Sequence, residues 1–194
     1  MRVSRIMPAP VAAGWVILGP MRRAIVFLLT VLWAGGAVRA AEKVSWPLSL
    51  REGLPNSLPG YATVERGGLA ETEENEMGTY TEVARMFQRI EGPASLKQFR
   101  LAVQDYKGGK DLTGPLKNAV EQARKAPGVE ARELRIADRA AFVVTDRSTG
   151  NPTTLVTVVV TPSRLVLGQG GNVDGEEALK LMGRVDFARI AGAK

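Results

Sequence analysis

The chain has 194 residues, with 26 Lys and Arg, 20 Asp and Glu, and neither His nor Cys. This composition excludes disulfides, thiolate nucleophiles and Cys-ligated metal clusters. It also excludes a Ser-His-Asp triad, an imidazole general base and a zinc site of the usual His type. The remaining reactive groups form no paired-carboxylate or phosphate-binding motif. We therefore expect a protein that is not an enzyme and that uses no cofactor or metal.

The first 40 residues are typical of a secretory signal peptide. A basic pair at 22–23 precedes an apolar run at 24–33, and Val38 and Ala40 suit the positions before a cleavage site. The alternative is an uncleaved membrane anchor, but the stretch 24–38 is shorter than the ~20 residues that a spanning helix needs. We expect cleavage after Ala40, membrane contact only during export, and a periplasmic or secreted protein.

A second methionine, Met21, stands directly before the basic pair. We expect translation to start there, which makes 1–20 an extension outside the translated chain; the alternative is a long basic leader. Five of the 26 basic residues and none of the acidic ones lie in 1–40, which leaves a net charge of +1 on the mature chain. The overall basic charge therefore does not indicate a nucleic-acid partner.

The mature chain from 41 to 194 is long enough for one domain with its own core. Proline and glycine are frequent in 41–78, which predicts an irregular arm packed on the domain and, after it, an acidic loop. The acidic residues of that loop are Glu71, Glu73, Glu74 and Glu76. We interpret them as a solvated loop; the alternative is a site for a hard cation such as Ca²⁺.

The segment 79–194 predicts a single α+β domain, with a mostly antiparallel sheet of about five to six strands and two packed helices. Alternating or continuous apolar patterns predict strands at 79–90, 98–106, 129–136, 139–146, 153–161 and 164–167. An apolar stripe and a Pro-Gly stop predict a helix at 112–126, and an Asp-x-x-Glu cap predicts another at 174–191. Short turns between strands indicate antiparallel pairing.

Trp46 and Tyr61 are the candidates for partner binding. They flank the proline-rich arm, and aromatic side chains beside prolines can line a groove for a ligand or peptide. The alternative is that they attach the arm to the core. Asp105 and Tyr106 end a strand and are a weaker candidate for acid–base chemistry. The glycine-rich segment 168–175 predicts a turn into a capped helix rather than a phosphate loop.

Several short motifs occur in a characteristic order. They are Leu-Pro-Asn-Ser-Leu-Pro-Gly-Tyr at 54–61, Gly-Thr-Tyr at 78–80, the strand at 99–105 and Val-Asp-Phe-Ala-Arg-Ile at 185–190. Together they resemble small exported bacterial proteins of unassigned function that open with a Leu-Pro-Gly-aromatic motif. The element order is also loosely similar to the PsbP-like α/β/α sandwich. The resemblance implies an accessory or binding protein, and it transfers no site residue.

These observations predict a non-enzymatic, exported accessory or binding protein of the bacterial envelope. Its partner would be a protein or an envelope component, bound through the sheet face or through the arm that carries Trp46 and Tyr61. The alternative is a carrier of a small lipid- or quinone-like ligand, with an apolar pocket between the sheet and the helices. A third hypothesis is a hydrolase that uses Asp105 and a second acid.

Overall fold

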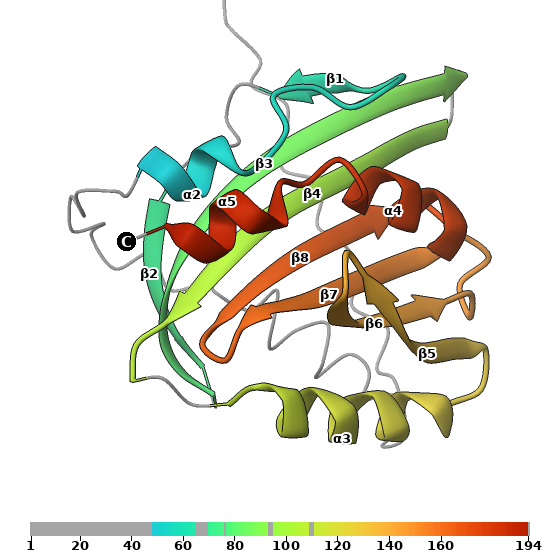
Figure 1. Cartoon of the computed structure of the whole chain (residues 1–194). Coiled ribbons are helices and arrows are strands. Elements are labelled where there is room, and N and C mark those ends of the chain that lie inside the picture. Colours follow the sequence, from blue (N-terminus) through green and yellow to red (C-terminus); the bar gives the residue numbers. More distant parts are fainter. Residues whose placement is uncertain (1–47, 65–69, 76, 93–94, 109–110, 194) are drawn as a thin grey trace, which may run out of the picture.

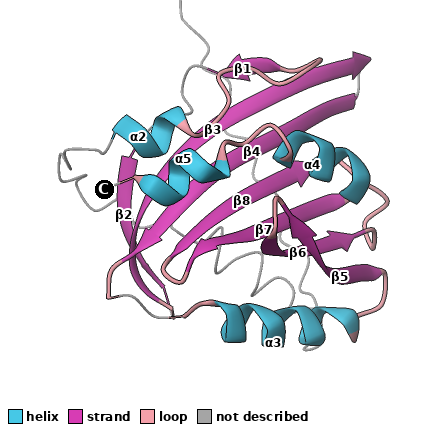
Figure 2. Ribbon diagram, viewed as in Figure 1, coloured by secondary structure: helices cyan, strands magenta, loops and turns pink. Residues whose placement is uncertain are grey.

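The computed structural model describes residues 48–64, 70–75, 77–92, 95–108 and 111–193. They form an antiparallel sheet with helices packed on it (Figures 1 and 2). The predicted signal peptide and Trp46 lie outside these ranges. Among the described helices, none has both the length and the apolar character needed to cross a membrane.

The sheet has eight strands in the described part of the chain. They are β1 (Ala62–Val64), β2 (Ala70–Asn75), β3 (Gly78–Gly92), β4 (Ser95–Tyr106), β5 (Val129–Ile136), β6 (Arg139–Asp146), β7 (Thr153–Thr161) and β8 (Arg164–Gly171). The order is β1-β3-β4-β8-β7-β6-β5, and β2 also pairs with β3. All pairs are antiparallel, which confirms the α+β class with a mostly antiparallel sheet.

The predicted number of strands was too low, because the stretch before residue 78 is more regular than its composition indicates. β1 lies in the predicted arm, and β2 covers most of the predicted acidic loop. β2 is paired along its whole length with β3, from Ala70 opposite Val83 to Asn75 opposite Gly78. Backbone pairing with a long neighbouring strand overrides the low strand propensity of glutamate.

Four helices are described, where two were predicted: α2 (Leu48–Glu52), α3 (Thr113–Arg124), α4 (Gly175–Met182) and α5 (Phe187–Gly192). α2 lies in the predicted arm. The helix predicted at 174–191 is two helices, because the chain leaves helical geometry after Met182 and begins again at a new cap. The Asp186 carboxylate accepts a hydrogen bond of 2.9 Å from the backbone N–H of Arg189 and so starts α5.

The helices lie on both faces of the sheet. Ala178 and Met182 of α4 and Ile190 of α5 share one core with Val143 of β6. Val120 and Ala123 of α3 share another core with the next residue of β6, Val144. Successive side chains of a strand point to opposite faces, so α3 covers the face opposite to α4 and α5. β7 is the buried central strand that its apolar run predicts.

Backbone conformation and close packing shape the sheet at two places. Ala137 and Asp138 both have positive φ, at 46° and 60°, as a two-residue type I′ hairpin requires between β5 and β6. Residues 168–171, predicted as a turn, continue β8 as a strand. A Cβ at Gly168 would lie 2.6 Å from Met182 Sδ and 2.9 Å from Phe99 Cζ. The lack of a side chain at Gly168 lets Met182 and Phe99 pack closely against the strand, and the chain does not turn there.

The β3–β4 hairpin extends beyond its neighbour β8. β4 pairs with β8 only as far as Gln98 opposite Gly171, whereas β3 and β4 remain paired up to Gly92 opposite Ser95. The end of the hairpin therefore projects from the sheet (Figure 1). This projecting end carries Ile90 and Leu96, two large apolar residues that are exposed to solvent.

Candidate functional site

The tip of the β3–β4 hairpin exposes two large apolar side chains. Ile90 is 80% exposed and Leu96 is 40% exposed. They are cross-strand partners, so they lie side by side on the same face of the hairpin. The next pair on that face is Gln88 and Gln98, which are uncharged. The apolar pair, hereafter the Ile90–Leu96 pair, thus has a polar but uncharged inner border.

The opposite face of the same tip carries charge. Arg89, Glu91 and Lys97 point away from the Ile90–Leu96 pair. Arg89 and Lys97 each pair with Glu91 and with Glu177 of α4; we call these four residues the Glu177 cluster. Lys97 Nζ lies 2.8 Å from Glu177 Oε2 and 3.3 Å from Glu91 Oε1. Arg89 Nη2 lies 3.0 Å from Glu177 Oε1 and also pairs with Glu91. The cluster joins the hairpin to the helix above the sheet.

Tyr61 completes this attachment from the N-terminal side. Its hydroxyl donates a hydrogen bond of 2.9 Å to Glu177 Oε1, and the Arg89 guanidinium carbon lies 4.9 Å from its ring centroid. Burial and the neighbouring Glu177 carboxylate raise the pKa of Tyr61 well above its usual range. The phenol therefore remains protonated, and able to donate, above the pH at which an ordinary tyrosine ionises.

The Leu-Pro-Gly-Tyr motif has a structural explanation. The backbone N–H of Tyr61 donates to the carbonyl of Leu58 over 3.1 Å, and Gly60 has φ of 75°. Pro59 followed by a glycine with positive φ is the pattern of a type II turn. The turn reverses the chain and places the Tyr61 ring in the core with Leu54 and Leu58.

Electrostatics favours the charged forms of Glu91 and Lys97. The hydrogen bond to Glu177 raises the pKa of Lys97, so this ammonium stays protonated. Arg89 and Lys97 balance Glu91 and Glu177 in number, so the four groups carry no net charge together. The cluster is thus an attachment that leaves neither cation available as an uncompensated charge at the tip.

The structure places only one of the two predicted partner-binding residues. Trp46 lies outside the described residues. Tyr61 is 7% exposed and contacts the residues that hold the hairpin. Partner binding through the arm stays a prediction, and in the structure Tyr61 acts on the tip by positioning Glu177. Sequence reasoning missed Ile90, because exposure at a strand end leaves no periodic signal.

Asp105 and Tyr106 are held in structural roles. Asp105 Oδ2 lies 2.8 Å from Arg164 Nη2, and Arg164 Nη1 donates to the carbonyls of Ile190 and Ala193. The Tyr106 hydroxyl donates 3.1 Å to Gln104, on the α3 face of the sheet. The Asp105 carboxylate therefore orients an arginine that secures the C-terminal helix.

A buried polar network lies on the α3 face and was not predicted. Glu82 is buried, and its Oε2 accepts a hydrogen bond of 2.9 Å from Gln104 Nε2. Glu82 also pairs with Arg100, whose Nη1 donates 3.2 Å to Gln169 Oε1. The network satisfies a buried carboxylate, as low-dielectric surroundings require. Within the described residues, no three carboxylates lie close enough together to hold a metal ion.

No protein-family model matches the chain, and no curated protein matches it in sequence. The functional conclusion therefore rests on the geometry of the projecting hairpin.

Proposed function

We propose that this chain is a non-enzymatic, exported accessory protein of the bacterial envelope that binds a protein partner through the tip of the β3–β4 hairpin. The observation that carries the proposal is the exposed Ile90–Leu96 pair on a hairpin held from behind by the Glu177 cluster. Burying an apolar side chain of this size in an interface yields about 1.5–3 kcal/mol.

Attachment of the hairpin supports recognition. A loop that is ordered only on binding loses conformational entropy at that moment, and this loss lowers affinity. Here Lys97 and Arg89 are already bound to Glu177, and Tyr61 holds Glu177 in place. The apolar pair is therefore presented in one orientation before the partner arrives.

A protein partner suits the tip better than a lipid surface. Binding to anionic membranes relies on clusters of uncompensated Lys and Arg. The two cations of the tip, Arg89 and Lys97, are paired with Glu91 and Glu177. Apolar side chains bordered by glutamines match the apolar centre and polar rim of a protein interface.

Two other hypotheses have less support from the geometry. A carrier of a lipid- or quinone-like ligand needs an apolar cavity, and the described pocket next to α4 is lined largely by charged side chains. A hydrolase that uses Asp105 needs a free carboxylate, and Asp105 is paired with Arg164.

The test compares crosslinked pull-downs of the tagged full chain from its own envelope. The double variant Ile90→Ser/Leu96→Ser removes the apolar pair, and Lys117→Ser on the exposed face of α3 is the matched control. We expect a stoichiometric protein partner with the wild type and the control. The partner, once purified, should bind the double variant at least about tenfold more weakly.

Three outcomes would contradict the proposal. Equal binding of the partner to the double variant would place the site elsewhere. Cosedimentation with anionic vesicles, lost in the double variant and without a protein partner, would indicate a lipid surface. Absence of any partner from the envelope would leave the accessory role without support. The double variant should unfold at the wild-type temperature, since both side chains are exposed.

A further inference from the structure

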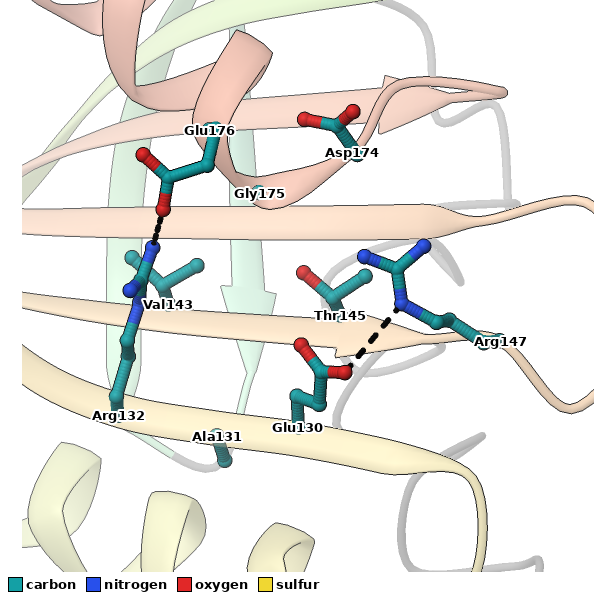
Figure 3. A pocket seen from close by; sticks show the side chains of 9 residues that line it. All are labelled: Glu130, Ala131, Arg132, Val143, Thr145, Arg147, Asp174, Gly175 and Glu176. Atoms are coloured by element: carbon teal, nitrogen blue, oxygen red, sulfur yellow. Dashed lines mark hydrogen bonds and ion pairs between the residues drawn. The ribbon is translucent and has the colours of Figure 1, made fainter.

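A pocket of about 460 Å³ lies beside the beginning of α4, above β5 and β6 (Figure 3). Its polar lining comes from three separate parts of the chain. These side chains are Glu130 and Arg132 of β5, Thr145 and Arg147 at the end of β6, and Asp174 and Glu176 at the start of α4. The volume is in the range of small-ligand sites.

Two ion pairs form opposite ends of this pocket (Figure 3). At one end Arg132 reaches from β5 to Glu176 of α4. At the other end Arg147 Nε lies 3.5 Å from Glu130 Oε1. The two pairs differ, because Arg132 is in direct hydrogen-bond contact with Glu176, whereas the Arg147 pair is long.

The floor of the pocket is firmly held. The Thr145 hydroxyl lies 3.1 Å from the hydroxyl of Thr154, which donates 2.7 Å to the carbonyl of Val173. A Cβ at Gly175 would lie 3.1 Å from Thr145 Oγ1. Helix α4 therefore begins close against the floor, and a larger residue at Gly175 would crowd the pocket.

Arg147 has unused hydrogen-bonding capacity. Within the described residues, its side chain forms an ion pair with Glu130 through Nε, and neither terminal nitrogen makes a hydrogen bond. Figure 3 shows the guanidinium between Glu130 and Asp174. A guanidinium with two free terminal nitrogens is the group that binds a carboxylate through two parallel hydrogen bonds.

The carboxylates also have unused acceptors. Asp174 uses Oδ1 to cap α4, accepting 2.8 Å from the backbone N–H of Glu177, and Oδ2 is not engaged by the described residues. Glu130 uses only Oε1. Three acids and two arginines line the pocket, so a simple dianion would be repelled. A ligand that also carries a positive group would be accepted.

We propose that this pocket binds a small zwitterion that carries a carboxylate and a primary ammonium, of the size of an amino acid or a dipeptide. The ligand carboxylate pairs with the terminal nitrogens of Arg147. The ligand ammonium contacts the free Oε2 of Glu130 or the free Oδ2 of Asp174. This site is separate from the hairpin tip and does not depend on the proposed partner.

The probe is L-alanyl-L-alanine, titrated into the ¹⁵N-labelled processed protein and followed by amide chemical shifts. We expect saturable shifts at the start of β5, the end of β6 and the start of α4. Two analogues test the two charges: N-acetyl-L-alanyl-L-alanine lacks the ammonium, and L-alanyl-L-alaninamide lacks the carboxylate. Each should bind at least about tenfold more weakly, because a charged group in the pocket then loses its partner.

Variants locate the site independently of the spectra. Arg147→Gln should weaken binding of the dipeptide at least about tenfold. Arg184→Gln is the matched control, because it removes an exposed arginine that does not line the pocket, and it should bind as the wild type does. Both variants should unfold cooperatively.

The proposal is overturned if no saturable shift appears up to about 20 mM dipeptide, a concentration far above a useful affinity. It is also overturned if Arg147→Gln binds as tightly as the wild type. If the amide analogue binds as tightly as the dipeptide, the pocket recognises only the ammonium and is a cation site. If the acetylated analogue binds as tightly, the pocket recognises only the carboxylate and is an anion site. Either result would exclude the zwitterion.

Discussion

Lys97 on β4 and Glu177 on α4 are 80 residues apart in sequence and are joined by a hydrogen-bonded ion pair of 2.8 Å. Both side chains are 19% exposed, so water screens the pair only partly. This contact connects the projecting end of the hairpin to α4. The orientation of the Ile90–Leu96 pair therefore depends on a helix that follows much later in the chain.

Glu177→Gln should destabilise the protein by about 1–2 kcal/mol, because Lys97 and Arg89 lose their shared carboxylate in a partly buried site. Urea unfolding measures this loss. The control is Glu176→Gln, the preceding residue on α4, whose side chain is 71% exposed. It should cost less than about 0.5 kcal/mol. Equal losses in both variants would mean that the Glu177 cluster does not stabilise the fold.

The raised pKa of Tyr61 predicts that the protein loses stability at high pH. The folded state keeps the phenol neutral because its pKa is raised, whereas the unfolded chain ionises it from about pH 10. The unfolded state then binds fewer protons, so the free energy of unfolding falls as pH rises above that value. Tyr61→Phe should remove this part of the pH dependence. Parallel curves for the two proteins between about pH 9 and 11.5 would contradict the assignment.

Gly168→Ala should destabilise the protein by about 1–3 kcal/mol, because the new methyl group would overlap Met182 of α4 and Phe99 of β4. Gly171→Ala in the same strand is the control, since a Cβ there meets nothing within 4 Å. The thermal unfolding temperatures of the two variants are compared. Both variants replace a strand glycine by alanine, so a difference between them measures the close packing at Gly168. Tolerance of alanine at Gly168 would show that α4 can move away from the sheet.

Arg164→Met should release the C-terminal helix. Arg164 donates to the carbonyls of Ile190 and Ala193, and a methionine fills much of the same volume without donating. Amide hydrogen exchange of α5 should rise at least about tenfold relative to that of β7, corresponding to about 1.4 kcal/mol of local stability. Asp105→Asn should raise it less, since Asp105 acts on α5 only through Arg164. Unchanged exchange in α5 would exclude this role of Arg164.

After residue 78, the apolar periodicity of the sequence predicts strands and a helix that the structure contains. The buried run at 153–161 predicts the central strand, and β7 lies between β6 and β8. The stripe of Val120 and Ala123 predicts the buried side of α3 correctly. These predictions succeed because the burial of alternate or every third to fourth residue is a local property of strands and helices.

Local patterns failed where pairing with another strand decides the conformation. Glu71 and Thr72 form a strand because β3 pairs with them. Gly168 continues β8 because it pairs with Leu101 of β4 and Val156 of β7. Both pairings are with another strand, so composition alone favoured a loop and a turn at these places.

The sequence by itself determined the α+β class, the antiparallel pairing through short turns, and the chemistry that is excluded by the lack of His and Cys. The Leu-Pro-Gly-Tyr turn is also local, since Pro59 and Gly60 set its backbone angles. Only the tertiary structure decided which charges meet. The sequence does not indicate which cations pair with Glu177, because ion pairs leave no periodic pattern in a sequence. Arg89 and Lys97 reach Glu177 only because folding places α4 above the β3–β4 hairpin.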